Sequence, residues 1–183
     1  MQKLIELIKM NNIRIIAIDG RCASGKTTLT KELQTQLNAE VIHLDDFFLS
    51  INQKTKERLN EIGGNIDYER FLSEVLVNLN TNNPFSYYKF DCSIQTLSTK
   101  FNVENNRIII IEGSYAHHPK FVKYYDLKVF VTVDSTEQIE RLSIRNPQLL
   151  NRFIDEWIPL EERYFNELKI LENADYIINT TNI

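Results

Sequence analysis

The feature that most constrains the fold of this chain is the eight-residue stretch GRCASGKT, from Gly20 to Thr27. It matches the pattern G-x-x-x-x-G-K-[ST], with an apolar run at residues 13–19 before it and a helical pattern at 27–37 after it. A glycine-rich loop between a strand and a helix turns backbone N–H groups toward an anion, and the helix dipole strengthens that site. An ordinary glycine turn is the alternative, but such a pattern arises in about one random chain of this length in a hundred. We therefore predict a phosphate-binding loop.

The loop also predicts which groups hold a nucleotide. Lys26 is expected to reach the outer phosphates, and the hydroxyl of Thr27 is expected to ligate Mg²⁺. We therefore expect ATP and Mg²⁺ as cofactors, with a preference for ATP over GTP left open. The predicted nucleotide-binding residues are Gly20, Ala23, Ser24, Gly25, Lys26, Thr27 and Thr28. Cys22, inside the loop, is interpreted as a small residue that fits there rather than as a redox group.

Strands alternate with helices along the chain. Apolar runs predict buried strands at 13–19, 39–46, 107–113, 126–134 and 174–180, and helical periodicity marks 2–10, 27–37, 67–79, 135–145 and 147–171. Residues 85–103 alternate loosely and predict short antiparallel strands. This order predicts a three-layer α/β fold, a five-stranded parallel sheet flanked by helices. We expect residues 1–183 to form one domain.

Composition excludes several classes of function. The net charge is −4 and no dense basic block occurs, so we expect no nucleic-acid partner. No apolar run reaches membrane-spanning length, and the amino end is too short and too charged for a signal peptide. Two cysteines make neither a disulfide framework nor a metal site. We therefore expect a cytoplasmic protein without a membrane partner.

Acidic residues follow two of the predicted strands. Asp45 and Asp46 end the second strand, and Glu112 ends the third after four isoleucines. Ligands of open α/β sheets bind at this edge. Phosphorylation of a hydroxyl needs a carboxylate that accepts its proton, whereas hydrolysis needs a positioned water and a binding module needs neither. Only one of the adjacent aspartates is expected to face the substrate, because neighbouring side chains on an extended chain point apart. Glu112 is placed to hold Mg²⁺ through water. A solvated acidic turn is the alternative for the aspartate pair.

Two arginines lie four residues apart on one predicted helix face. Arg141 and Arg145 suit the stabilisation of a transferring phosphoryl group, and the helix break at Asn146 and Pro147 suggests a short mobile lid. The alternative is a solvated basic face paired with Glu137 and Glu140.

These residues together resemble the uridine kinase family of small-molecule kinases, which includes nicotinamide riboside kinases, phosphoribulokinase and bacterial pantothenate kinase. The resemblance covers most of the chain and implies a P-loop NTPase fold with five parallel strands. It implies that Asp45 is the base, that Asp67 holds ribose hydroxyls, and that Phe48 and Tyr88 contact the substrate, with Tyr88 packed against a base. The motifs that carry it are the loop at 20–28, DDFF at 45–48, NID at 65–67, YKFD at 88–91, IEG at 111–113 and the Arg141/Arg145 pair.

The chain also departs from that family. Uridine kinases carry a base-reading His five residues after the Tyr, and Ser93 stands at that position here. The segment RFIDEWIPLEERYF (152–165) is not the usual ending, and we expect its EWIPLEERYF part (156–165) to close over the acceptor with Trp157 or Tyr164. Uridine and cytidine are therefore expected to be poor acceptors, unless His117 or His118 restores base reading.

The sequence thus predicts a kinase that moves the γ-phosphate of ATP·Mg²⁺ to a hydroxyl of a small metabolite, a nucleoside or ribose-like compound. A nucleoside monophosphate kinase is one alternative, kept open by Arg58 as a residue for a phosphate already on the acceptor. A regulatory P-loop ATPase without kinase activity is another. The identity of the acceptor stays open, and so does a homodimer.

Overall fold

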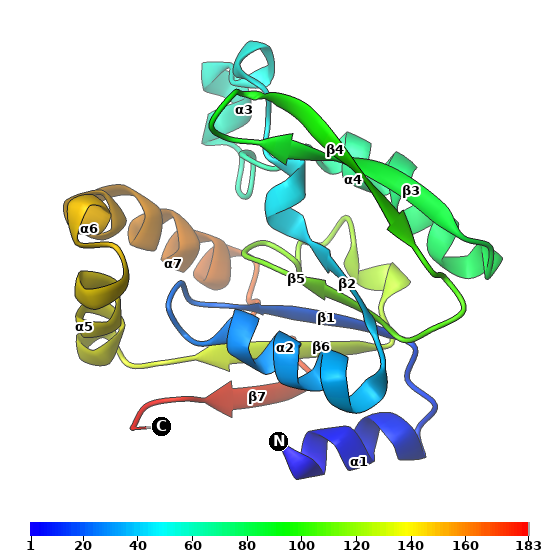
Figure 1. Ribbon diagram of the computed structural model, residues 1–183. Coiled ribbons are helices and arrows are strands. Elements are labelled where there is room, and N and C mark those ends of the chain that lie inside the picture. Colours follow the sequence, from blue (N-terminus) through cyan, green and yellow to red (C-terminus); the bar gives the residue numbers. More distant parts are fainter. Residues whose placement is uncertain (183) are drawn as a thin grey trace.

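The protein folds around a central sheet of five parallel strands, which confirms the predicted fold class (Figure 1). The structure, a computed structural model, describes residues 1–182. The strands lie in the order β2-β5-β1-β6-β7. Their bounds are β1 (Ile15–Gly20), β2 (Glu40–His43), β5 (Ile109–Glu112), β6 (Leu127–Thr132) and β7 (Tyr176–Asn179). Because β1 lies between β5 and β6, the glycine-rich loop that follows it begins at the centre of the carboxyl edge of the sheet.

Alternate side chains of the strands bury two separate cores. Ile16, Ile18 and Ile110 point toward α1 (Gln2–Met10) and α2 (Lys26–Leu37). Ile109 and Ile111 point to the opposite face, where the core includes residues of α4 (Tyr68–Glu74) and α7 (Ile158–Glu167). This alternation follows from the two-residue period of a strand, and burial on both faces explains the near-continuous apolar runs.

The remaining helices are α3 (Lys56–Asn60), α5 (Ser135–Arg145) and α6 (Leu150–Arg152). The expected helix at 67–79 is shorter, because α4 ends at Glu74 and a 3₁₀ segment continues from Leu76 to Thr81. The expected helix at 147–171 is also broken. It begins as a 3₁₀ turn at Pro147–Leu149 and contains a π-helical turn at Phe153–Trp157 between α6 and α7.

A two-stranded antiparallel hairpin stands apart from the main sheet (Figure 1). It consists of β3 (Phe85–Asp91) and β4 (Thr96–Val103), as the loose alternation predicted. Its tip lies near the residues before α3, where Lys54 Nζ donates to Gln95 Oε1 over 3.4 Å. The hairpin therefore reaches over the edge of the sheet at which the acidic residues lie.

In the part of the chain that the structure describes, no helix combines the length and the apolar character needed to cross a bilayer.

Gly20 is required by a close approach of two strands. Its φ is +138°, and a Cβ at this position would lie 1.9 Å from the carbonyl oxygen of Val131 on β6. We therefore expect Gly20→Ala to lower the free energy of unfolding by about 1–3 kcal/mol from overpacking and by a further 1–3 kcal/mol, roughly, from backbone strain. Urea unfolding followed by circular dichroism measures this. Gly25→Ala is the matched control, because its φ is +93° but the nearest atom lies 3.9 Å away, so it carries the strain alone. Equal losses in the two variants would contradict the packing argument.

Candidate active site

The glycine-rich loop is held from outside by its carbonyl groups. Donors on α5 and after β7 bind three successive carbonyls: Gln138 to Cys22 at 3.0 Å, Arg141 to Ala23 at 3.2 Å and Thr180 to Ser24 at 2.8 Å. In a trans peptide the next N–H points opposite to the carbonyl. The N–H groups of Ala23 and Gly25 are therefore turned toward the inside of the loop, where α2 begins at Lys26 and adds its own unpaired N–H groups.

A cavity of about 350 Å³ lies inside this loop. The structure brings the predicted loop and both predicted arginines together there, since the lining residues are Ala23, Ser24, Gly25, Lys26, Thr27, Thr28, Arg141 and Arg145. Gly20 lies outside that lining, at the end of β1. The buried Oγ of Ser24 has no hydrogen-bond partner within residues 1–182. A cradle of N–H groups with an unsatisfied hydroxyl suits a polyphosphate.

The two arginines of α5 differ in the groups to which they donate hydrogen bonds. The guanidinium of Arg141 pairs with Glu137 and also donates to Thr180 O at 2.7 Å and to Ala23 O, so it holds the loop. Arg145 donates only to its neighbour Asn146, at 2.9 Å, among the described residues. Arg145 is therefore the arginine of the pair that a phosphate can engage without loss of a loop contact.

Lys26 is buried beneath the loop. Its Nζ donates to Gly20 O at 2.6 Å and to Arg21 O at 2.9 Å. An ammonium carries three donors, so one remains for a phosphate. Lys26 thus holds the loop closed, and its remaining donor is available for a phosphate bound there.

The two side chains that are predicted to hold Mg²⁺, Thr27 and Glu112, meet at the mouth of the loop. Thr27 Oγ1 donates to Glu112 Oε1 at 3.2 Å, and Glu112 Oε2 contacts His43 Nδ1 at 2.8 Å. Burial alone would raise the pKa of Glu112, but the hydrogen bond from His43 and the charge of Lys26 outweigh it and lower that pKa. Residues 1–182 contain no cluster of three acidic, His or Cys side chains that could hold a metal. Mg²⁺ fits nonetheless, because it keeps several waters and takes one or two protein carboxylates together with phosphate oxygens.

The two adjacent aspartates have different surroundings. They lie in a 3₁₀ turn, Leu44–Phe47, directly after β2, which ends earlier than expected. Asp46 accepts a hydrogen bond from Tyr87 at 2.8 Å and pairs with Lys89 at 3.4 Å. Asp45 is exposed, and its carboxylate has no partner of this kind within residues 1–182. Desolvation by the protein around it, and then the charge of Glu112, raise the pKa of Asp45, while Lys26 and His43 oppose the shift. Asp45 is thus the aspartate of the pair that can accept a proton.

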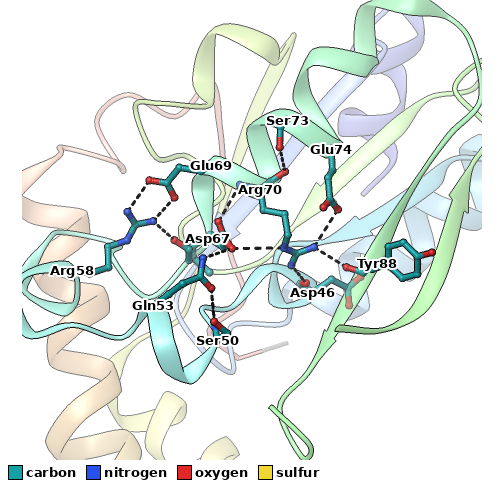
Figure 2. A network of polar contacts seen from close by, with 11 residues as sticks. Asp46, Ser50, Gln53, Arg58, Asp67, Glu69, Arg70, Ser73, Glu74 and Tyr88 are labelled. Atoms are coloured by element: carbon teal, nitrogen blue, oxygen red, sulfur yellow. Dashed lines mark hydrogen bonds and ion pairs between the residues drawn. The ribbon is translucent and has the colours of Figure 1, made fainter. Parts of the chain in front are cut away.

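A network of polar contacts ties the acidic turn to the hairpin and to α4 (Figure 2). Arg70 donates to the backbone carbonyls of Asp46 at 2.5 Å and Tyr88 at 2.7 Å. Asp67 caps α4 by accepting from the N–H of Arg70 at 3.0 Å, and it also accepts from Gln53 Nε2 at 2.7 Å. The carboxylate predicted to hold ribose hydroxyls is therefore buried among protein donors in this structure.

The other residues predicted to contact the acceptor lie around this network. Arg58 pairs with Glu69, donates to two backbone carbonyls and stacks on the ring of Tyr68, with 3.4 Å between its Cζ and the ring centroid. Phe48 is half-buried and pairs with Ile66 through a single β-bridge. The ring of Tyr88 is 47% exposed and points away from the network (Figure 2). A second cavity of about 360 Å³ adjoins Arg58, and its lining is Leu49, Gln53, Thr55, Glu57, Arg58, Glu61 and Glu69.

The expectation for the late segment is wrong for Tyr164. Tyr164 does not close over an acceptor: it is fully buried and donates to Asp19 Oδ2 at 2.7 Å beneath the loop. Trp157 packs on Phe153 in the π-helical turn. His117 is also buried, with its N–H donated to Asp19 at 2.9 Å, so it does not enter an acceptor site.

Several residues that shape the site were not predicted from the sequence. They are His43, Arg70, Tyr87, Lys89, Gln138 and Glu161. Each is brought to the site by contacts between elements distant in the chain, and no local pattern marks them.

Comparisons with known proteins agree with this geometry. No protein-family model matches the chain. Uridine kinase from Oceanobacillus iheyensis is 30% identical over 152 residues, which cover 77% of this chain and 71% of that protein. Uridine kinase-like protein 5 from Arabidopsis thaliana is 26% identical over 181 residues, which cover 90% of this chain, but the chain spans only 38% of the length of that relative. A solved structure of a possible uridine kinase from Bacillus stearothermophilus shares the fold, with a TM-score of 0.66, 20% identity and coverage of 90% of this chain and 88% of that one.

The thiol of Cys22 should be unreactive although it lies in a ligand-binding loop. Burial, and then the negative charge of Glu161, raise its pKa to about 12. At pH 8 only about one thiol in ten thousand would then be the reactive thiolate. We expect iodoacetamide at pH 8 to label the exposed Cys92 well before Cys22, as followed by peptide mass spectrometry. Labelling of both cysteines at the same rate would show that the environment of Cys22 is different.

Proposed function

The chain belongs to the uridine kinase family of P-loop small-molecule kinases, and from that membership we propose that it transfers the γ-phosphate of ATP to a hydroxyl group of a small metabolite in the cytoplasm. A nucleoside or another ribose-like compound is the proposed acceptor. The products are ADP and the phosphorylated acceptor.

One observation carries this proposal. Asp45 presents an exposed carboxylate without a protein partner, in the turn next to Glu112 and Lys26, while Asp46 is bound by Tyr87 and Lys89. In the proposed step the acceptor oxygen attacks the γ-phosphorus, Asp45 takes the hydroxyl proton, and the bond to the ADP oxygen breaks. A carboxylate left free beside the phosphate loop is what this step needs.

The other residues position and neutralise the phosphates. Lys26 and Arg145 line the loop cavity and would meet the charge of the transferring group. For Arg141 we propose support of the loop through the carbonyl of Ala23, in place of the phosphoryl-stabilising role that the sequence predicted. Thr27 and Glu112 would hold Mg²⁺, which would offset the negative charge of the phosphates.

The alternatives are less well supported. A nucleoside monophosphate kinase needs free basic groups for the phosphate of its acceptor, and the guanidinium of Arg58 is taken up by Glu69 and by backbone carbonyls. A regulatory ATPase needs no carboxylate base, so the freedom of Asp45 has no function in it.

Asp67 can meet a ribose-like diol only if Gln53 withdraws from its carboxylate.

An acceptor screen tests the proposal. We expect one or more compounds from a panel of nucleosides, vitamins and sugars to stimulate ADP release by the wild-type protein, with Lys26→Ala as the inactive background. Uridine and cytidine should stay below about 10⁴ M⁻¹s⁻¹ in kcat/KM, the lower end of ordinary enzymes, because the hydroxyl of Ser93 is bound to Asp91 at 2.5 Å and reads no base. Slow ADP release that no compound stimulates would favour the regulatory alternative.

Substitution of Asp45 and substitution of Asp46 should have different effects on kcat. Asp45→Asn keeps the shape of the side chain but removes the base, so we expect kcat with the acceptor found in the screen to fall about 10²–10⁴-fold. The affinity for MgATP should change little. Asp46→Asn is the matched control and should cost less, because Asp46 contacts Tyr87 and Lys89 rather than the reacting groups. An unchanged kcat for Asp45→Asn at saturating acceptor would refute the role of Asp45.

A further inference from the structure

Part of the segment EWIPLEERYF, on α7 (Ile158–Glu167), lies against the phosphate loop. Glu161, on α7, is buried, and its carboxylate accepts two hydrogen bonds. One comes from the backbone N–H of Cys22 at 2.9 Å and the other from the hydroxyl of Ser114 at 2.7 Å. Ser114 lies two residues after Glu112, which ends β5. Glu161 therefore joins the loop to the end of the neighbouring strand.

Two more residues of α7 contact the loop or the residue directly before it. Glu162 makes a two-pronged ion pair with Arg21, at 2.7 and 2.9 Å. Tyr164 donates to Asp19, whose other carboxylate oxygen accepts the N–H of Gly20 at 2.7 Å. The helix therefore contacts Asp19, Arg21 and Cys22.

Cys22 is consequently fixed from both sides. Its carbonyl is bound by Gln138 of α5 and its N–H by Glu161 of α7. A residue whose two backbone groups are both bound cannot rotate either adjoining peptide, so it sets the direction of the N–H of Ala23 that follows. The short lid, with its 3₁₀ and π-helical turns, joins these same two helices.

We propose that Glu161 is a positioning residue for nucleotide binding, which holds the first half of the phosphate loop in its anion-binding conformation through Cys22 and Ser114. This inference rests on the proposed nucleotide site but not on the identity of the acceptor. A carboxylate so close to a polyphosphate site repels the ligand, so an electrostatic contribution of Glu161 to binding would be unfavourable. Its contribution is therefore the geometry that it imposes on the loop.

Two substitutions separate geometry from charge. Glu161→Gln removes the charge but keeps both contacts, because the amide oxygen can accept from Cys22 and the amide N–H can donate to Ser114 Oγ. Glu161→Asp keeps the charge but is one methylene shorter, so it cannot reach both partners. We expect the dissociation constant for MgATP, measured by isothermal titration calorimetry, to rise about tenfold in Glu161→Asp and to stay within about threefold of wild type in Glu161→Gln.

The matched controls lie on the same helix. Glu167 pairs with Arg163 at the surface, so Glu167→Asp and Glu167→Gln should bind MgATP like the wild type. Hydrogen exchange gives a second readout, since the amide of Cys22 should exchange faster in Glu161→Asp alone. A merely structural role would lower the melting temperature of Glu161→Asp without a change in the affinity of its folded fraction, and that result would overturn the inference.

The reverse order of effects would overturn it too. If Glu161→Asp binds like wild type while Glu161→Gln differs, the charge matters and the geometry does not. Failure of the proposed nucleotide site looks different, because the wild-type protein would then bind MgATP no better than Lys26→Ala. Binding by the wild type, its loss in Lys26→Ala and wild-type affinity in Glu161→Asp would sink this inference alone.

Discussion

The buried carboxylate of Asp19 is the interaction on which the site depends. It has no exposed surface, and it accepts hydrogen bonds from the N–H of Gly20, the N–H of His117 and the hydroxyl of Tyr164. These donors come from the phosphate loop, from the segment after β5 and from α7. A buried carboxylate is tolerated only when its oxygens are satisfied, and buried donors are equally costly to leave unpaired. The three segments must therefore meet at Asp19, and their meeting fixes where the loop begins.

From that anchor the loop is built by opposing contacts. Its carbonyls are drawn outward by Gln138, Arg141 and Thr180, and the N–H of Cys22 is drawn outward by Glu161. What remains directed inward is a set of N–H groups with the ammonium of Lys26. We therefore expect a preference of the cavity for anions to come from the direction of the backbone more than from the number of basic side chains, because the guanidinium of Arg141 already donates to Glu137, Ala23 and Thr180.

The sequence predicted the fold and the nucleotide half of the site because their signals are local. The run of isoleucines in β1 and β5, the glycine spacing of the loop and the i, i+4 arginines of α5 are each visible within a few residues. The parts that it could not predict depend on distant contacts. In the sequence, Tyr164 resembles any other aromatic residue of an amphipathic helix. Its role depends on the contact with Asp19, which lies 145 positions earlier in the chain. The 3₁₀ turn after β2 was missed for a similar reason, because Tyr87 and Arg70 stabilise it from other elements.

The proposed acceptor side is constructed differently, and this difference bears on the specificity that we propose. The nucleotide cavity is framed by strand ends and by long helices packed on the sheet, whereas the acceptor side consists of a 3₁₀ turn, short helices and the tip of a hairpin. Arg70 and Arg58 hold these pieces by their backbone carbonyls, at Asp46, Tyr88, Gly64 and Ile66. Contacts to carbonyls fix the course of the chain but place no demand on the side chains that it carries. Exposed positions of the hairpin tip, such as Ser93, can therefore change, and we expect such changes to alter the acceptor without disturbing Asp45 or the phosphate loop.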